Sequence, residues 1–119
     1  MGRAAIVGDA AHINNPLGGM GINGGIHNAI NLSDKLSAIL KDGADIDALL
    51  DRFSAQRRSI VEEYMQTHTH KNKQVIEEKD PVKRAAHLKE VATTPDALLA
   101  YMRKGAMLDT VDKSMDVMP

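Results

Sequence analysis

The sequence predicts a mainly α-helical fragment with one or few strands, and two observations lead to this prediction. Apolar residues recur at helical spacing through most of the chain, whereas only one short apolar run has the length of a buried strand. Residues 1–33 contain seven of the nine glycines and only two charged side chains, Arg3 and Asp9. We therefore expect residues 1–33 to be buried or to face a ligand, and the rest to be scaffold.

The expected strand is the apolar run 4–7, and a glycine-rich stretch follows it. A carboxylate at the end of a strand, as Asp9 would be, can accept hydrogen bonds from sugar hydroxyls. Glycines allow positive φ angles and a close approach of the backbone to a ligand. A helix beginning near Gly21 offers unpaired N–H groups and a positive dipole end. We expect a polyhydroxylated, partly anionic ligand here, with a helix or turn cap as the alternative role of Asp9.

The first two helices have clear boundaries. One is expected at 22–40, ended by Lys41-Asp42-Gly43 with the glycine just beyond the helix. The next begins with Asp45 or Asp47 as its N-cap and continues as far as residue 79.

Two shorter helices follow, each opened by an N-cap residue and a proline. Asp80-Pro81 and Thr94-Pro95 have this pattern, and Gly105 ends the second of these helices. We assign no structure to residues 106–119, because this segment has no clear signal for the start or the end of a helix. The two expected ranges are 81–92 and 95–104.

Composition excludes several classes of protein. The 119 residues include 15 basic and 16 acidic side chains, which gives no electrostatic reason to expect nucleic acid or an anionic membrane as partner. No apolar run approaches the length of a membrane span. The absence of cysteine excludes disulfides and thiolate metal sites, and it fits a cytoplasmic enzyme, which we expect.

Several polar residues have a structural and a functional interpretation. His68 and His70 could form part of a metal site, but residues two apart on a helix point to different faces, so solvated surface is favoured. For His12 we expect a hydrogen bond to the backbone. Arg57 and Arg58 could hold a phosphate, but ion pairing on an acidic helix is favoured.

The stretch from Gly8 to Ala29 resembles the second FAD motif of the FAD-dependent aromatic hydroxylases. These are the class A flavoprotein monooxygenases, which include p-hydroxybenzoate and salicylate hydroxylases. Their motif is roughly G-D-A-A-H-x-x-x-P-x-G-G-x-G-x-N-x-G-I-x-D-A. The chain departs from it at Asn15, Met20, His27 and Asn28. A fainter similarity continues through residues 31–36 to residues 53–58.

The resemblance implies the C-terminal part of an α/β FAD-binding domain like that of p-hydroxybenzoate hydroxylase. Residues 1–41 would supply a strand, the FAD-binding loop and a flavin-facing helix. Residues 42–119 would form a helical C-terminal scaffold, the two parts making one incomplete domain. Family members open with a strand-loop-helix GxGxxG fingerprint. The GxGxxG at 19–24 lies eleven residues beyond the expected strand, so it does not form this fingerprint. An N-terminal GxGxxG half, in the same or a separate chain, is thus an expected partner.

The resemblance also implies how the cofactor is held. Asp9 would bind the ribityl or ribose hydroxyls of FAD, Pro16 and the following loop would line the flavin near its reactive edge, and the amides of Ile22 and Asn23 would face the pyrimidine side of the ring. We assign no catalytic residue and no metal ligand, because the cofactor carries the chemistry. The expected cofactor-binding residues are Asp9, Pro16, Gly18, Gly19, Gly21, Ile22 and Asn23.

The activity that the resemblance implies is hydroxylation of a small aromatic substrate with NAD(P)H and O2 by a FAD-dependent monooxygenase. Two alternatives stay open. Another flavoprotein oxidoreductase of the same superfamily, an epoxidase or a halogenase, would share the motif. A truncated, non-catalytic helical fragment would retain the motif without binding flavin.

Overall fold

The computed structural model describes residues 4–118, apart from the side chains of residues 87 and 88. Within this part the chain is helical and contains no β-strand, so the predicted strand is wrong there. Residues 4–7 have no regular secondary structure, although Val7 has extended dihedral angles (φ −136°, ψ 164°). A strand needs a neighbour for its backbone N–H and C=O groups, and the described chain offers none. Residues 1–3 and 119, the outer ends of the two predicted parts, lie outside the described residues.

Two short 3-10 turns lead into the first helix. They are η1 (Gly8–Ala10) and η2 (Pro16–Gly18), and α1 (Gly21–Asp42) follows. Gly8 and Gly19 have φ angles of 62° and 63°, in the left-handed region. Glycine adopts this region without a steric penalty, so these two positions let the chain reverse direction before α1.

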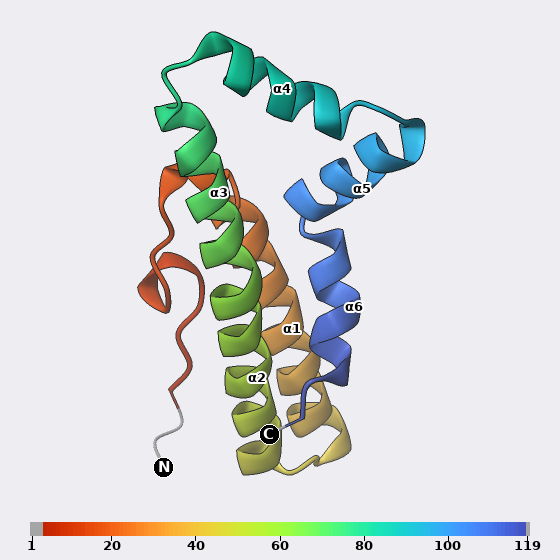
Figure 1. Ribbon diagram of the computed structural model, residues 1–119. Helices are drawn as coiled ribbons and strands as arrows, with labels where there is room; N and C mark the ends of the chain where they lie inside the picture. Colours follow the sequence, from red (N-terminus) through yellow and green to blue (C-terminus); the bar gives the residue numbers. More distant parts are fainter. Residues whose placement is uncertain (1–3, 119) are drawn as a thin grey trace.

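Helices α1 and α2 form an antiparallel pair, as Figure 1 shows. Gly43, with φ 67°, ends α1 as expected. The next helix, α2 (Ile46–Ile60), is capped by Asp45, whose Oδ1 accepts hydrogen bonds from the amides of Asp47 (2.9 Å) and Ala48 (3.1 Å). Of the two expected cap residues, Asp45 is therefore the correct one.

Helix α2 continues without a break into α3. A π-helical turn, η3 (Val61–Met65), joins it to α3 (Gln66–Glu77). Such turns hold one residue more than an α-helical turn and often lie near functional sites. The expected long helix is thus confirmed, ending two residues before the expected limit.

Of the last three helices, the first crosses beyond the end of α3, and the other two return toward α2 (Figure 1). Both expected caps are confirmed: Asp80 accepts a hydrogen bond from the amide of Val82 (2.9 Å), and Thr94 accepts one from the amide of Ala97 (3.1 Å). Residues 108–116, to which the sequence assigned no structure, form the final helix. The three helices are α4 (Pro81–Val91), α5 (Pro95–Gly105) and α6 (Leu108–Asp116).

Helix α6 is held against α2 by polar contacts to its C-terminal end. Arg52 donates a hydrogen bond to the carbonyl of Met115 (3.1 Å), and Gln56 donates one to the carbonyl of Val117 (3.5 Å). Met107, which precedes α6, has φ 59° and is the one non-glycine residue of the described chain in the left-handed region. The turn between α5 and α6 therefore fixes an unfavourable backbone conformation at a buried residue.

The core is built largely from methionine. Gly24 lets α1 approach it closely, because a Cβ atom at that position would lie 3.1 Å from Met65 Cε. Flexible thioether side chains fill irregular gaps of this kind. The buried cluster consists of Met20, Ile60, Met65 and Met107, with Val61 and Tyr64 packed against its edge.

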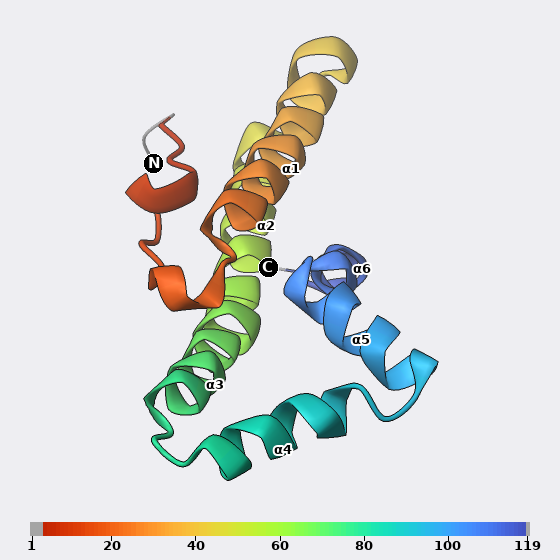
Figure 2. The same ribbon diagram turned by 90° about the horizontal axis from the view of Figure 1, so that it is seen from above.

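The molecule is elongated, with extents of 57 × 27 × 20 Å and a radius of gyration of 17.2 Å (Figure 2). A compact domain of this length has a radius of gyration of about 13–14 Å. Ile22, Ile26 and Ile30 lie along one face of α1 and are 80%, 51% and 55% exposed. No described element covers this face, so residues 1–33 are not buried there, and whether the face meets a ligand stays a prediction.

Candidate functional site

A pocket of about 510 Å³ lies between η1, the loop that contains η2, and the start of α1. Figure 2 shows these segments, red to orange, beside the first turns of α1. Its volume falls within the range of small-molecule sites, about 300–1,000 Å³. Four of its nine lining residues are glycines, which leave the backbone open to a ligand. The lining residues are Gly8, Asp9, Asn14, Asn15, Pro16, Gly19, Gly21, Ile22 and Gly25.

Asp9 brings a carboxylate to this pocket. It lies in η1, and its side chain is exposed. A Cβ atom added to Gly21 would lie 4.0 Å from Asp9 Oδ1, so the carboxylate stands beside the start of α1. No hydrogen bond to this carboxylate occurs within the described part of the chain. The alternative role of Asp9 as a helix or turn cap therefore has no hydrogen bond to support it.

The start of α1 contributes unpaired donors to the same pocket. Met20 occupies the N-cap position, and its side chain supplies no hydrogen bond. The first intrahelical bond is donated by Gly24 to the carbonyl of Met20, at 2.8 Å. The amides of Gly21, Ile22 and Asn23 therefore precede the hydrogen-bonded ladder, and the positive end of the helix dipole lies with them.

The loop of the pocket is fastened to α3. The hydroxyl of Thr69 donates a hydrogen bond to Asn14 Oδ1 (3.2 Å), and the side-chain amide of Asn72 donates one to the carbonyl of Leu17 (3.2 Å). A Cβ atom at Gly18 would collide with Thr69 Oγ1, so a larger residue here would displace the hydroxyl that anchors the loop to α3. The shape of the pocket thus depends on residues 55 positions away in the sequence.

These contacts correct the prediction for the His68-Thr69-His70 segment. His68 and Thr69 are buried, and only His70 is exposed as expected. Packing against the loop and against α5, where the rings of His68 and Tyr101 lie 6.5 Å apart, explains this burial. No group of three or more potential metal-ligating side chains occurs among the residues that the structure describes.

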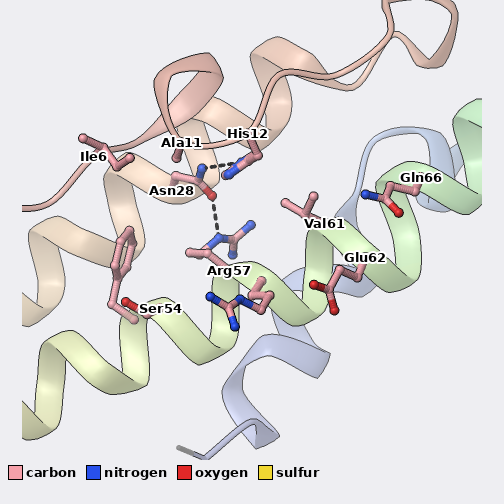
Figure 3. A pocket seen from close by; sticks show the side chains of 11 residues that line it. Ile6, Ala11, His12, Asn28, Ser54, Arg57, Val61, Glu62 and Gln66 are labelled. Atoms are coloured by element: carbon pink, nitrogen blue, oxygen red, sulfur yellow. Dashed lines mark hydrogen bonds between the residues drawn. The ribbon is translucent and has the colours of Figure 1, made fainter.

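A chain of hydrogen bonds runs from α2 through Asn28 of α1 to His12, which follows η1 (Figure 3). Arg57 Nε donates to Asn28 Oδ1, and Asn28 Nδ2 lies 2.9 Å from His12 Nε2. Because an amide nitrogen can only donate, His12 Nε2 must be the acceptor, so the neutral ring carries its proton on Nδ1. The predicted backbone hydrogen bond of the His12 ring is wrong, since its partner is a side chain.

The predicted ion pairing of Arg57 is also wrong. Its side chain is only 5% exposed, and in the described chain it makes no ion pair with a carboxylate. The side chain instead lies across the interface between α1 and α2, where its partner is the neutral amide of Asn28. Such an interface cannot be seen from the spacing of charges on a single helix.

Burial lowers the pKa of His12, and the nearby charge of Arg57 lowers it further, while Asp9 acts in the opposite direction. Burial and Arg57 also lower the pKa of His27, and burial together with two lysines lowers that of His68. The neutral form that the Asn28 hydrogen bond requires of His12 is therefore also the form that its surroundings favour.

Lowering the pH from about 7 to about 5 is expected to lower the free energy of unfolding. The three histidines titrate below about 6.5 in the folded state, whereas the unfolded chain takes up protons near that value. The unfolded state thus binds more protons as the pH falls, and stability is lost in that window. Urea titrations followed by circular dichroism at a series of pH values measure the change.

A glutamine at position 12 should make this pH dependence shallower, because one of the shifted groups is gone. The matched control is His70→Gln, which removes an exposed histidine and should leave the dependence as it was. An unfolding midpoint that stays constant or rises toward pH 5 would contradict the expectation.

A comparison with models of protein families identifies the family of the segment that forms this pocket. The model of a family described as FAD binding domain matches residues 1–68, more than half of the chain. The chain belongs to the FAD binding domain family. The matched segment holds every residue that lines the 510 Å³ pocket.

Several proteins that are similar in sequence to this chain are named as monooxygenases. A para-nitrophenol 4-monooxygenase of Pseudomonas sp. (strain WBC-3) is 38% identical over 95 residues, which cover 77% of this chain and 23% of the relative. A 4-methyl-5-nitrocatechol 5-monooxygenase of Burkholderia sp is 48% identical over 59 residues, 50% of this chain and 11% of the relative. A tetracenomycin A2 monooxygenase-dioxygenase of Streptomyces glaucescens is 51% identical over 59 residues, 50% of this chain and 10% of the relative. The chain thus spans less than a quarter of the length of each.

Two further observations concern solved structures and membrane-spanning helices. No solved structure matches the chain. Among the described helices, none has the length and apolar character that crossing a membrane requires.

The structure gathers most of the residues expected to bind FAD. Asp9, Pro16, Gly19, Gly21 and Ile22 line the 510 Å³ pocket. Of the other two, Gly18 lies against α3, and Asn23 has its amide in the first turn of α1 without lining the pocket. Four further lining residues were not among the expected ones, although all lie in the stretch that resembles the FAD motif. They are Gly8, Asn14, Asn15 and Gly25.

Proposed function

We propose that this chain is the C-terminal part of the FAD domain of a flavin-dependent monooxygenase that hydroxylates an aromatic substrate. The observation that carries the proposal is the pocket in which a free carboxylate, a glycine-lined wall and an open helix start meet. When bound, FAD takes electrons from NAD(P)H and supplies the oxygen chemistry. The names of the relatives, among them a nitrophenol and a nitrocatechol monooxygenase, support an aromatic substrate.

In this proposal Asp9 accepts hydrogen bonds from the ribityl or ribose hydroxyls of FAD. Its carboxylate has no partner in the described chain and lies beside Gly21. A carboxylate that accepts from hydroxyl groups makes a charge-assisted hydrogen bond, which is stronger than a neutral one. An acidic side chain that is exposed beside glycine backbone fits a sugar better than it fits a structural cap.

The loop and the helix start hold the ring of the cofactor. Pro16 and the residues after it line the ring near its reactive edge, where Gly18 and Gly19 shape the loop. The amides of Ile22 and Asn23 face the pyrimidine side, where the unpaired donors of a helix start favour negative charge. Residues 1–41 thus form the cofactor-facing part and residues 42–119 the scaffold.

The remaining part of the FAD site lies in a partner segment with a GxGxxG fingerprint. The exposed isoleucines of α1 and the apolar residues 4–7, which pair with no strand in the described chain, are surfaces of the kind that further protein covers. For this reason we expect the isolated chain to retain FAD only weakly.

A chimera tests the proposed function. The whole chain replaces the matching segment of the Pseudomonas para-nitrophenol 4-monooxygenase, which supplies the partner segment. We expect the chimera to purify with bound FAD and to oxidise NAD(P)H when an aromatic substrate is added. A soluble, helical chimera without FAD would support the truncated, non-catalytic alternative. One that holds FAD but acts on no aromatic compound would favour an epoxidase or a halogenase.

A further inference from the structure

Arg57 is a buried cation without an anionic partner. Its side chain is 5% exposed, and its Nε donates to the neutral amide of Asn28. Its Nη2 atom is closed to water and has no hydrogen-bond partner within the described residues. Buried arginines are nearly always paired, because an unpaired charge or donor in the protein interior costs free energy. This guanidinium therefore lacks an acceptor that its burial calls for.

The surroundings of Arg57 do not supply this acceptor. Both polar atoms of the Asn28 amide are already used, one by Arg57 and one by His12. No hydrogen bond joins Arg57 to the ring of His27 among the described residues; burial lowers the pKa of His12 and of His27, and the charge of Arg57 lowers both further. Glu62 lines the same pocket as Arg57 but forms no ion pair with it in the described chain. Arg57 thus has no anionic partner among the described residues.

A second pocket, of about 350 Å³, lies against this guanidinium. Figure 3 shows the guanidinium of Arg57 between His12 and Val61, which both line the pocket. Arg58 adds a second guanidinium to the lining, and its side chain is exposed. The pocket shares no lining residue with the 510 Å³ pocket, so it is a separate site.

We propose that the 350 Å³ pocket binds an oxyanion, a carboxylate or a phosphate, through the guanidinium of Arg57. Because Nη2 is closed to water, an anion in the pocket first meets the rest of the guanidinium and reaches Nη2 only after a small shift of the side chain. Arginine presents a planar set of donors that matches the oxygen atoms of these groups. Arg58 strengthens the positive field at the rim, while Glu62 on the same lining opposes it and limits the affinity. The oxyanion comes either from solution or from an acidic side chain of the partner segment, and the second source rests on the proposed function.

The first experiment uses the chain itself and inorganic phosphate. Urea unfolding is followed by circular dichroism at neutral pH with increasing phosphate, and sodium chloride keeps the ionic strength constant. We expect a saturable rise in the unfolding midpoint, because a ligand that binds only the folded state stabilises it. Arg57→Gln should lose this rise. The control Arg84→Gln removes an exposed arginine outside the pocket and should keep it. A wild-type midpoint that does not respond to phosphate would overturn the proposal.

Asn28→Asp provides a second variant in case Arg57→Gln does not fold. It places a carboxylate where Arg57 Nε already donates, with little change in shape, and His12 can change its tautomer to donate to the new oxygen. We expect a higher midpoint without phosphate and a weaker response to phosphate, because the carboxylate comes from within the chain. A variant that responds to phosphate as strongly as the wild type would count against the proposed site.

The chimera described above distinguishes the two sources of the oxyanion. If the phosphate response persists in the FAD-loaded chimera, the site takes a free anion. If the response is lost while FAD stays bound, an acidic side chain of the partner segment occupies it. The phosphate experiment on the isolated chain needs no flavin, so failure of the chimera to bind FAD leaves its result unaffected.

Discussion

Replacing Asp9 with alanine in the FAD-loaded chimera should weaken FAD binding about ten- to hundredfold. The substitution removes a carboxylate that has no other hydrogen-bond partner in the described chain and that lies beside the open start of α1. A hydrogen bond to a charged group contributes about 1.5–3 kcal/mol, which corresponds to the expected loss. Titration of the apoprotein with FAD, followed by flavin fluorescence, gives the dissociation constant.

Two further variants show whether the charge or the position of Asp9 matters. Asp9→Asn keeps an acceptor oxygen and should lose less affinity than Asp9→Ala. Asp112→Ala removes an exposed carboxylate of α6, outside the pocket, and should bind FAD like the parent. If Asp9→Ala bound FAD with the affinity of the parent, Asp9 would have no role in holding the cofactor.

Truncating Met107 to alanine should destabilise the chain by about 2–5 kcal/mol, as large-to-small core substitutions do. Met107 is 0% exposed and packs with Met20, Ile60 and Met65. Alanine keeps the Cβ atom, so the cost of the left-handed backbone at this position is retained and the loss reflects the buried side chain. The shift of the urea unfolding midpoint measures it.

Exposed methionines provide the matched control for this prediction. Met102 lies on α5 and is 61% exposed, so Met102→Ala should change stability by no more than about 0.5 kcal/mol. Met107→Leu conserves volume and should cost less than about 1.5 kcal/mol. Equal effects of the alanine substitutions at positions 102 and 107 would show that the methionine cluster contributes nothing specific.

The sequence predicted the helix boundaries well because the signals that set them are local. Gly43 ends α1, Asp45 caps α2, and Thr94 with Pro95 opens α5. Each signal acts on backbone groups within a few residues, so no knowledge of the fold is needed. Helix α6 was missed because it follows Met107, which offers no capping side chain and adopts a conformation typical of glycine.

The predictions that failed depend on contacts between segments far apart in the chain. The run 4–7 is apolar enough for a strand, but a strand needs a partner. Arg57 was expected to form an ion pair on its own helix and His68 to lie on the solvated surface, yet each is buried against a segment at least 29 residues away. For the candidate site, the motif-like stretch identified the loop and Asp9. It could not show that Gly18 packs on α3, because Thr69 determines this contact.

The π-helical turn between α2 and α3 determines which side of α3 meets the loop. The buried residues of α2 recur at a spacing of three or four up to Ile60, but the next buried residue is Met65, five positions on, followed by His68 and Thr69. One residue corresponds to about 100° of rotation around a helix. The extra residue of the turn therefore rotates all of α3 into the orientation in which Thr69 and Asn72 reach the loop.

The orientation of α3 thus depends on the number of residues in the segment Val61–Met65. Deleting one residue from it would return the turn to α-helix and rotate Thr69 and Asn72 away from the loop by about 100°. A change of side chain at Glu62, which is exposed, would leave this geometry intact. Related chains that anchor the loop in this way should therefore align across the segment without gaps.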